Sequence, residues 1–383
     1  METTDKSYQL MACHYIDGQL KKLSREIDGA RECRDIECIH QSRVASRRLR
    51  AALVIFENCF PAKAIKKWRK EIKSLTKAFG PARDTDVQIE YLKKMISDIR
   101  ENKKAILPGI KRLLLRTTQR REKLQSKVIK TIDKLESKSI LADIHSAIER
   151  ILFCIHVEEA DLKNEYVFRQ TSEHIQSKLN ELLSHQNSLD NPEDKSGHHQ
   201  MRIAAKRLRY TMEICREPYE GRLDNTIKII KKLQTLLGDI HDCDVWIEHI
   251  EHFKKEEFER TKEYFGNEKS YYFLQSGLDY LQKERRQTRK QLFEILVRYW
   301  KKLNRHNAIQ SIAKLAEHNS LEPKLKEPEN TTGKQAFKIA AIEKKTSPSS
   351  IKLRRNKQSK ITFFRNNTIT NKNNTEDEIT NKS

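Results

Sequence analysis

A short pattern of cationic side chains occurs twice in this chain of 383 residues. The segment HQSRVASRRLR, beginning at His40, recurs as HQMRIAAKRLR, beginning at His199, at an offset of 159 residues. At about 100° per residue, an α-helix would place the cations of each segment within an arc of roughly 80°. These cations are His40, Arg43, Arg47 and Arg50 in the first copy, and His199, Arg202, Lys206 and Arg209 in the second. Such groups on one helix face bind anions through charge-assisted hydrogen bonds.

Both cationic faces lack the acidic residues that normally neutralise such a helix surface. No Asp or Glu occurs from His40 to Arg50 or from His198 to Tyr210, although like charges at helical spacing are destabilising. We therefore expect an anionic ligand to supply the countercharge. The two histidines could instead act as general acids, because imidazole titrates near neutrality, but no orienting carboxylate or nucleophile stands beside them in the sequence.

The segments that follow each motif add a second basic face. Lysines recur at spacings of 4, 3 and 4 in the first copy, and two equivalents occur in the second: Lys66, Lys70, Lys73 and Lys77, then Lys228 and Lys231. If consecutive helices are neighbours, these lysines border the same basic strip. Arg48 and Arg207 lie about 100° away from the stripe, so we expect them to brace the helices against an acidic neighbour, with Asp84 and Asp242 as candidates.

A second block is repeated after each motif. FGPARDTDV, residues 79–87, matches LGDIHDCDV, residues 237–245. Gly80 and Gly238 are predicted to end the lysine-bearing helices, with an Asp shortly afterwards at the start of the next helix. The weaker alternative is a divalent ion held by Asp239, His241, Asp242 and Asp244. The first copy has Pro81 and Arg83 where Asp239 and His241 stand, so we expect no metal and no other cofactor.

The elements that must position these residues are helices. Ten Gly and eight Pro are few for this length, strand-like alternation is scarce, and helical periods run through residues 8–27, 39–60, 64–79, 84–99, 107–135 and 140–155 before a similar series resumes. The sequence predicts an all-α fold of two repeats, residues 6–158 and 159–317. Each repeat has enough helices for an antiparallel four-helix bundle, and the two would pack about a pseudo-twofold axis. Residues 318–383 are predicted to be a disordered basic tail.

Composition limits the remaining classes of protein. Lys and Arg number 76 against 54 Asp and Glu, a net charge of +22, which favours polyanionic partners. No apolar run is long enough to span a membrane and the N-terminus lacks a secretory layout, so we expect a cytoplasmic protein with no membrane partner. The seven cysteines are never spaced CxxC, which argues against zinc knuckles. Nucleotide-binding and nucleophile-elbow motifs are missing.

With both repeated blocks in view, the chain resembles the CHAD family, the conserved histidine α-helical domain, over roughly residues 6–317. This resemblance implies a basic central cavity, between two four-helix bundles, that binds inorganic polyphosphate without catalysis, and association with polyphosphate granules. The resemblance implies that the eight motif cations face the ligand. It also implies that the basic helix after each motif forms the second wall of the cavity. The glutamate and lysine strands of the CYTH-type domain that often accompanies this family do not occur here, so triphosphate hydrolysis is not expected.

Three function classes remain open from the residues. A polyphosphate-binding module fits best, because polyphosphate carries dense charge and no bases, and the stripe has no interleaved aromatic residues. A nonspecific nucleic-acid binder is the alternative that net charge permits, although single-strand binding usually needs stacking rings. An enzyme acting on condensed phosphates would need a metal-binding carboxylate cluster. We expect no catalytic residues, weak nucleic-acid binding at most, and the oligomeric state stays open.

Overall fold

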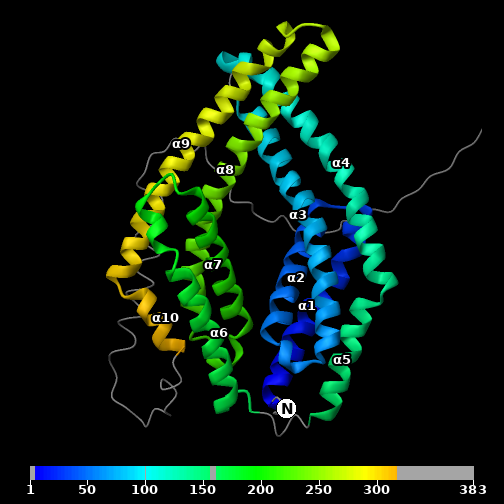
Figure 1. Cartoon of the computed structure of the whole chain (residues 1–383), viewed down its shortest axis with the longest axis vertical. Coiled ribbons are helices and arrows are strands. Elements are labelled where there is room, and N and C mark those ends of the chain that lie inside the picture. The colour runs from blue at the N-terminus through cyan, green and yellow to red at the C-terminus, as the bar shows by residue number, and fades with distance from the viewer. Residues whose placement is uncertain (1–4, 100, 156–160, 317–383) are drawn as a thin grey trace, which may run out of the picture. The chain divides into compact units, whose positions relative to one another are not determined.

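The computed structural model describes residues 5–99, 101–155 and 161–316, and every long element within them is an α-helix (Figure 1). This confirms the predicted all-α fold. The first repeat contains α1 (Lys6–Glu32), α2 (Ile36–Ile55), α3 (Ala62–Asp98), α4 (Leu107–Ser137) and α5 (Ile140–Cys154). The second contains α6 (Glu165–Leu183), α7 (Lys195–Ile214), α8 (Asp224–Phe265), α9 (Lys269–Arg305) and α10 (Ala308–Ala316). The predicted boundary at residues 158 and 159 and the predicted tail lie outside the described residues.

The two series of helices begin and pack in the same order. Asp5 caps α1 and Asn164 caps α6, while Asp35 caps α2 and Asp194 caps α7, each accepting a backbone N–H of the first turn. In each series consecutive helices pack together as far as the fourth, and the fifth returns to the first. The repeat in the sequence is thus a repeat of helical elements, and both copies belong to one compact unit. A pseudo-twofold axis between them stays a prediction.

The predicted helix ends at Gly80 and Gly238 are wrong. α3 continues through Gly80 and Pro81, and α8 continues through Gly238. Proline removes one backbone hydrogen bond and crowds the preceding turn, but an apolar stripe that includes Leu75, Phe79 and Ala82 stays buried on both sides of it. Packing therefore outweighs the local preference for a break, and the aspartates that follow lie inside helices rather than at caps.

One aspartate of each repeated block forms a buried ion pair with the next helix. Arg121 of α4 donates from Nε to Asp86 of α3 at 2.7 Å, and Arg289 of α9 donates from Nε to Asp244 of α8 at 2.6 Å. All four side chains are less than 10% exposed. Such a pair fixes register because removing one partner would leave a charge buried without compensation. Asp244 is thereby engaged by an arginine, which argues against its role in a metal site.

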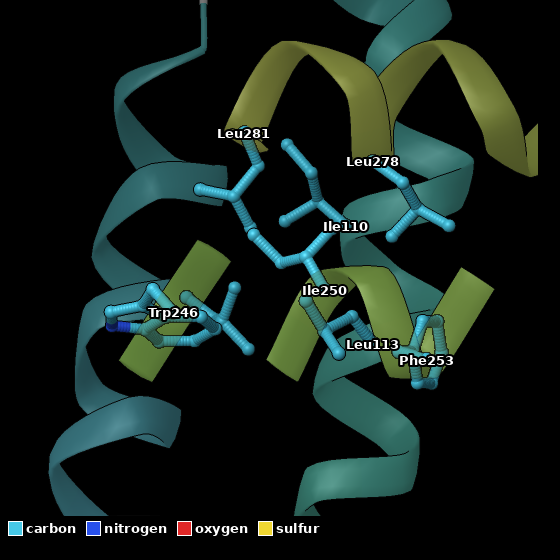
Figure 2. Close-up of a cluster of buried hydrophobic side chains, with 8 residues drawn as sticks. Ile110, Leu113, Trp246, Ile250, Phe253, Leu278 and Leu281 are labelled. Carbon is cyan, nitrogen blue, oxygen red and sulfur yellow. The ribbon is translucent and has the colours of Figure 1, made fainter. Parts of the chain in front are cut away.

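The two repeats share a hydrophobic core where the long helices cross. Leu92, Ile110 and Leu113 of the first repeat pack with side chains of the second: Trp246, Ile250, Phe253, Leu278 and Leu281. Figure 2 shows these side chains converging between the ribbons. Apolar burial of this kind contributes about 25 cal/mol per Å², and it joins helices that are far apart in sequence.

Close to this core, α4 and α9 approach each other through glycines. A Cβ atom on Gly109 would overlap the carbonyl oxygen of Leu274, and one on Gly277 would overlap that of Ile106. Because the obstacles are backbone atoms, neither position can accept a methyl group unless the helices move apart. The crossing of the two repeats depends on these two residues having no side chain.

We predict that Gly277→Ala lowers the free energy of unfolding by roughly 1–3 kcal/mol, as overpacking does. Gly18→Ala is the matched control, because no atom lies within 4 Å of a Cβ built there and alanine favours a helix interior by about 1 kcal/mol. Urea denaturation followed by circular dichroism measures both changes. Equal stability of the two variants would contradict the close crossing.

Candidate anion-binding site

Helices α2 and α7 pack against each other and bring the two cationic motifs together. Tyr210 of α7 is buried, and the guanidinium groups of Arg47 and Arg209 lie 5.4 and 5.0 Å from its ring centroid. Glu213 joins the same helices, since it accepts a hydrogen bond from Arg48 Nη2 at 3.0 Å and lies 3.3 Å from Arg209 Nε. One ring and one carboxylate thus fix how the two basic helices meet.

Four cations at this contact have no carboxylate within salt-bridge distance in the described part of the chain. They are Arg47, Arg50, Arg202 and Lys206, all half-buried, and we call them the cationic cluster. Burial lowers the pKa of Lys206 to about 8, and the positive charges of Arg47 and Arg202 contribute to this lowering. Burial also lowers the pKa of Arg47 and of Arg50. The cluster concentrates positive charge that an anion could neutralise.

Asp84 and Asp242, which are equivalent positions of the two repeated blocks, lie beside this cluster. Asp84 Oδ1 is 3.6 Å from Arg43 Nη2, and the charge of Asp242 partly opposes the lowering of the Arg202 pKa by burial. The sequence suggested Asp84 and Asp242 as partners of Arg48 and Arg207, but the structure gives these arginines other partners. Arg48 pairs with Glu213 of α7, and Arg207 pairs with Glu181 of α6.

The histidines of the motifs lie against the repeated block of the following helix. His199 Nδ1 is 3.3 Å from His241 Nδ1, and His40 is close enough to Arg83 for that charge to lower its pKa, after burial. Burial and neighbouring cations also lower the pKa of His199, and that of His241 to about 4. The lowered pKa values favour the neutral form of all three imidazoles in the free protein.

Arg83 and His241 lie beside the motif histidines, although the sequence indicated neither as an anion-binding residue and His241 only for the weaker metal alternative. They occupy equivalent positions, three residues after Gly80 and Gly238. Because α3 and α8 are continuous, a residue three positions after the glycine lies on the same helix face as the glycine. At Gly80 the nearest atoms to an added Cβ are those of the Arg43 guanidinium, at 3.9 Å. Their equivalent positions in the two repeated blocks are the sequence feature that could have indicated them.

The predicted lysines divide between two hollows. The first hollow, of about 960 Å³, is lined by Arg50 together with Lys66, Lys70 and Lys73 of α3. The second hollow, of about 790 Å³, is lined by Arg48 together with Lys228 and Lys231 of α8. Lys77 lines neither of these two hollows. The lysines thus line two separate hollows, and Arg50 of the cationic cluster lines the first. One common basic strip stays a prediction.

Metal-ligating clusters and membrane-spanning helices are both missing from the described residues. No group of three or more His, Cys, Asp or Glu side chains among them could hold a metal ion. No helix in the same part of the chain combines the length and the apolar character that a membrane crossing requires.

Fold and site define an all-α domain with two repeated series of helices and a cationic contact between them. A family model of the CHAD domain matches residues 14–251, more than half of the chain. The chain therefore belongs to the CHAD domain family, which confirms the resemblance seen in the sequence.

Solved structures show the same fold. The crystal structure of the CHAD domain from the plant Ricinus communis aligns with a TM-score of 0.54 and 18% identity, over 80% of this chain and 92% of that one. PptA from Streptomyces chartreusis aligns with a TM-score of 0.52 and 13% identity, over 76% of this chain and 99% of that one. Curated proteins give no match. At these identities the likeness concerns the fold alone.

The cationic cluster predicts an unusual titration of Lys206. In the free protein its pKa is about 8, against about 10.4 for an unperturbed lysine. Reductive methylation with ¹³C, followed by NMR, should give a lysine signal that titrates near pH 8 and is missing from Lys206→Arg. The labelled α-amino group also titrates near this pH, and its signal should persist in Lys206→Arg. Sulfate should shift this titration upward, because an anion stabilises the charged form. A value near 10, or one that sulfate does not move, would contradict the cluster.

Proposed function

We propose that this protein binds inorganic polyphosphate along the contact between α2 and α7. The single observation that carries the proposal is the cationic cluster, in which side chains of both repeats meet without carboxylate partners among the described residues. A chain of phosphates carries about one negative charge per unit and presents acceptor oxygens on every side, so it complements closely spaced Arg, Lys and His groups. Lysines of the first hollow extend the same surface.

The surroundings of the cluster favour polyphosphate over nucleic acid. Single-strand binders stack bases on aromatic rings. The ring in contact with the cluster, Tyr210, is 8% exposed and already packs against Arg47 and Arg209. A base would find no free face on this ring, whereas phosphate groups need only donors. Nucleic acid would then bind weakly and without sequence preference, through general charge attraction.

We propose a binding role without catalysis, in the cytoplasm and in association with polyphosphate granules. Cleavage of a phosphoanhydride bond usually requires a metal ion or a positioned nucleophile to handle the developing charge. The imidazoles nearest the cluster lie beside cations or another imidazole, and these neighbours do not orient a general base. The family resemblance supports the granule association and a ligand that is bound without being chemically changed.

The first test measures affinity and ligand class together. Labelled long-chain polyphosphate bound to the full chain is displaced by unlabelled polyphosphate, single-stranded DNA or duplex DNA at near-physiological salt. Polyphosphate should displace the label at a far lower phosphate concentration than either DNA. Equal displacement by all three would overturn the proposal and leave a generic polyanion surface.

Removing cations from the cluster should separate binding from stability. In Arg50→Gln, Lys206→Gln, we expect the affinity for polyphosphate to fall by about 100-fold or more, since two cations are removed and each hydrogen bond to a charged group contributes roughly 1.5–3 kcal/mol. The melting temperature should stay the same or rise, because mutual repulsion is relieved. Fluorescence anisotropy and thermal unfolding measure the two effects.

The matched control is Lys123→Gln, Lys127→Gln on an exposed face of α4, which removes the same charge away from both hollows. This control should retain its affinity within about twofold. A loss of melting temperature in the cluster variant, with affinity unchanged, would mean that these cations serve the fold and not a ligand.

A further inference from the structure

The two hollows share equivalent positions in the helices that follow the two motifs, and α1 lines the second hollow in addition. Lys70 and Lys73 of the first hollow correspond to Lys228 and Lys231 of the second, in the helices that follow the two motifs. Each hollow also receives one arginine from the other repeat, Arg207 in the first and its equivalent Arg48 in the second. The duplication therefore supplies two hollows beside the cationic cluster with matching lysines.

The hollows differ in charge. The lining of the first contains six Lys or Arg side chains and one acidic side chain, Glu57, which is bound to Arg69. The lining of the second contains five Lys or Arg side chains and four acidic ones: Glu213, Glu217, Glu220 and Asp224. A polyanion approaching the second hollow would meet carboxylates as well as cations.

The difference begins at one pair of equivalent positions next to the cluster. One turn after Arg50 stands Val54, which is 45% exposed, whereas one turn after Arg209 stands Glu213. The carboxylate of Glu213 lies 3.3 Å from Arg209 Nε and accepts from Arg48 Nη2 at 3.0 Å. Glu213 thus pairs with Arg48, which lines the second hollow, and with Arg209 of the motif. Arg50 at the first hollow has no such partner among the described residues. Burial lowers the pKa of Arg50 most, and the charges of Arg47 and Arg207 lower it as well.

From this asymmetry we infer that bound polyphosphate extends from the cationic cluster into the first hollow and is excluded from the second by Glu213 and its acidic neighbours. The inference rests on the proposed function and specifies the path of the ligand. Lys66, Lys70 and Lys73 line this path beyond Arg50, on an exposed face of α3 that keeps these lysines free to follow successive phosphates. The path is open on the side of the first repeat alone.

The duplication offers a test by equivalent substitutions in the full chain. Lys70→Glu, Lys73→Glu and Lys228→Glu, Lys231→Glu change the net charge equally and at corresponding positions. With long-chain polyphosphate at near-physiological salt, the first variant should lose at least about tenfold in affinity, and the second should stay within about twofold. Equal losses in both variants would overturn the one-sided path.

Exchanging the residues at the controlling position tests the cause. Val54→Glu should place a carboxylate beside Arg50 and weaken binding. Glu213→Val should free Arg48 and Arg209, strengthen binding, and make Lys228→Glu, Lys231→Glu as damaging as the first lysine variant. If Glu213→Val leaves the effect of the second lysine pair unchanged, Glu213 does not close that side.

Failure of this inference is distinguishable from failure of the proposed function. If the wild-type chain binds polyphosphate no better than DNA, or if Arg50→Gln, Lys206→Gln retains full affinity, the proposed function fails. If both of those results support polyphosphate binding but the two lysine pairs contribute equally, the ligand path alone is wrong. Circular dichroism on every variant confirms that helicity is retained.

Discussion

The rest of the structure depends on holding like charges together between α2 and α7. Such a cluster repels itself, and in the described residues no carboxylate comes within salt-bridge distance of its four members. The compensating free energy must come from packing elsewhere, because apolar burial is the largest favourable term in folding. The core shared by α3, α4, α8 and α9 and the glycine crossing nearby join the two repeats, so the cations stay adjacent without being neutralised.

Acidic residues are distributed so that none of those described forms a direct salt bridge with this cluster, although Asp84 and Asp242 lie near it. Asp86 and Asp244 are committed to Arg121 and Arg289 in the interior of their own repeats. Other carboxylates brace arginines that lie off the stripe, as Glu181 does for Arg207. Buried pairs such as those of Asp86 and Asp244 contribute little net stability, but they are costly to break and so specify register. Because structural ion pairs and ligand-facing cations are separate, the same basic helices can stabilise the fold and also present cations to a ligand.

Features set by periodicity and repetition could be predicted from the sequence, whereas features set by the register between helices could not. Apolar spacing identified the helices, and the duplicated motif predicted that equivalent basic faces would meet. Gly80 and Pro81 suggested a break because local preferences do not include the buried stripe on both sides of it. Arg48 pairs with Glu213 rather than Asp84 because ion-pair partners depend on how neighbouring helices slide and rotate. The positions of Arg83 and His241 beside the motif histidines could be predicted only if α3 and α8 were known to be continuous.

Duplication followed by divergence explains why the two halves need not act alike. Equivalent positions have similar backbone surroundings, so a functional difference can be traced to single side chains. Arg47 lies against the ring of Tyr210, where a planar guanidinium is better suited than an ammonium. Burial and neighbouring cations lower the pKa of its equivalent Lys206 to about 8, while an arginine stays charged at any physiological pH. The charge at this pair of equivalent positions is thus permanent at Arg47 and adjustable at Lys206.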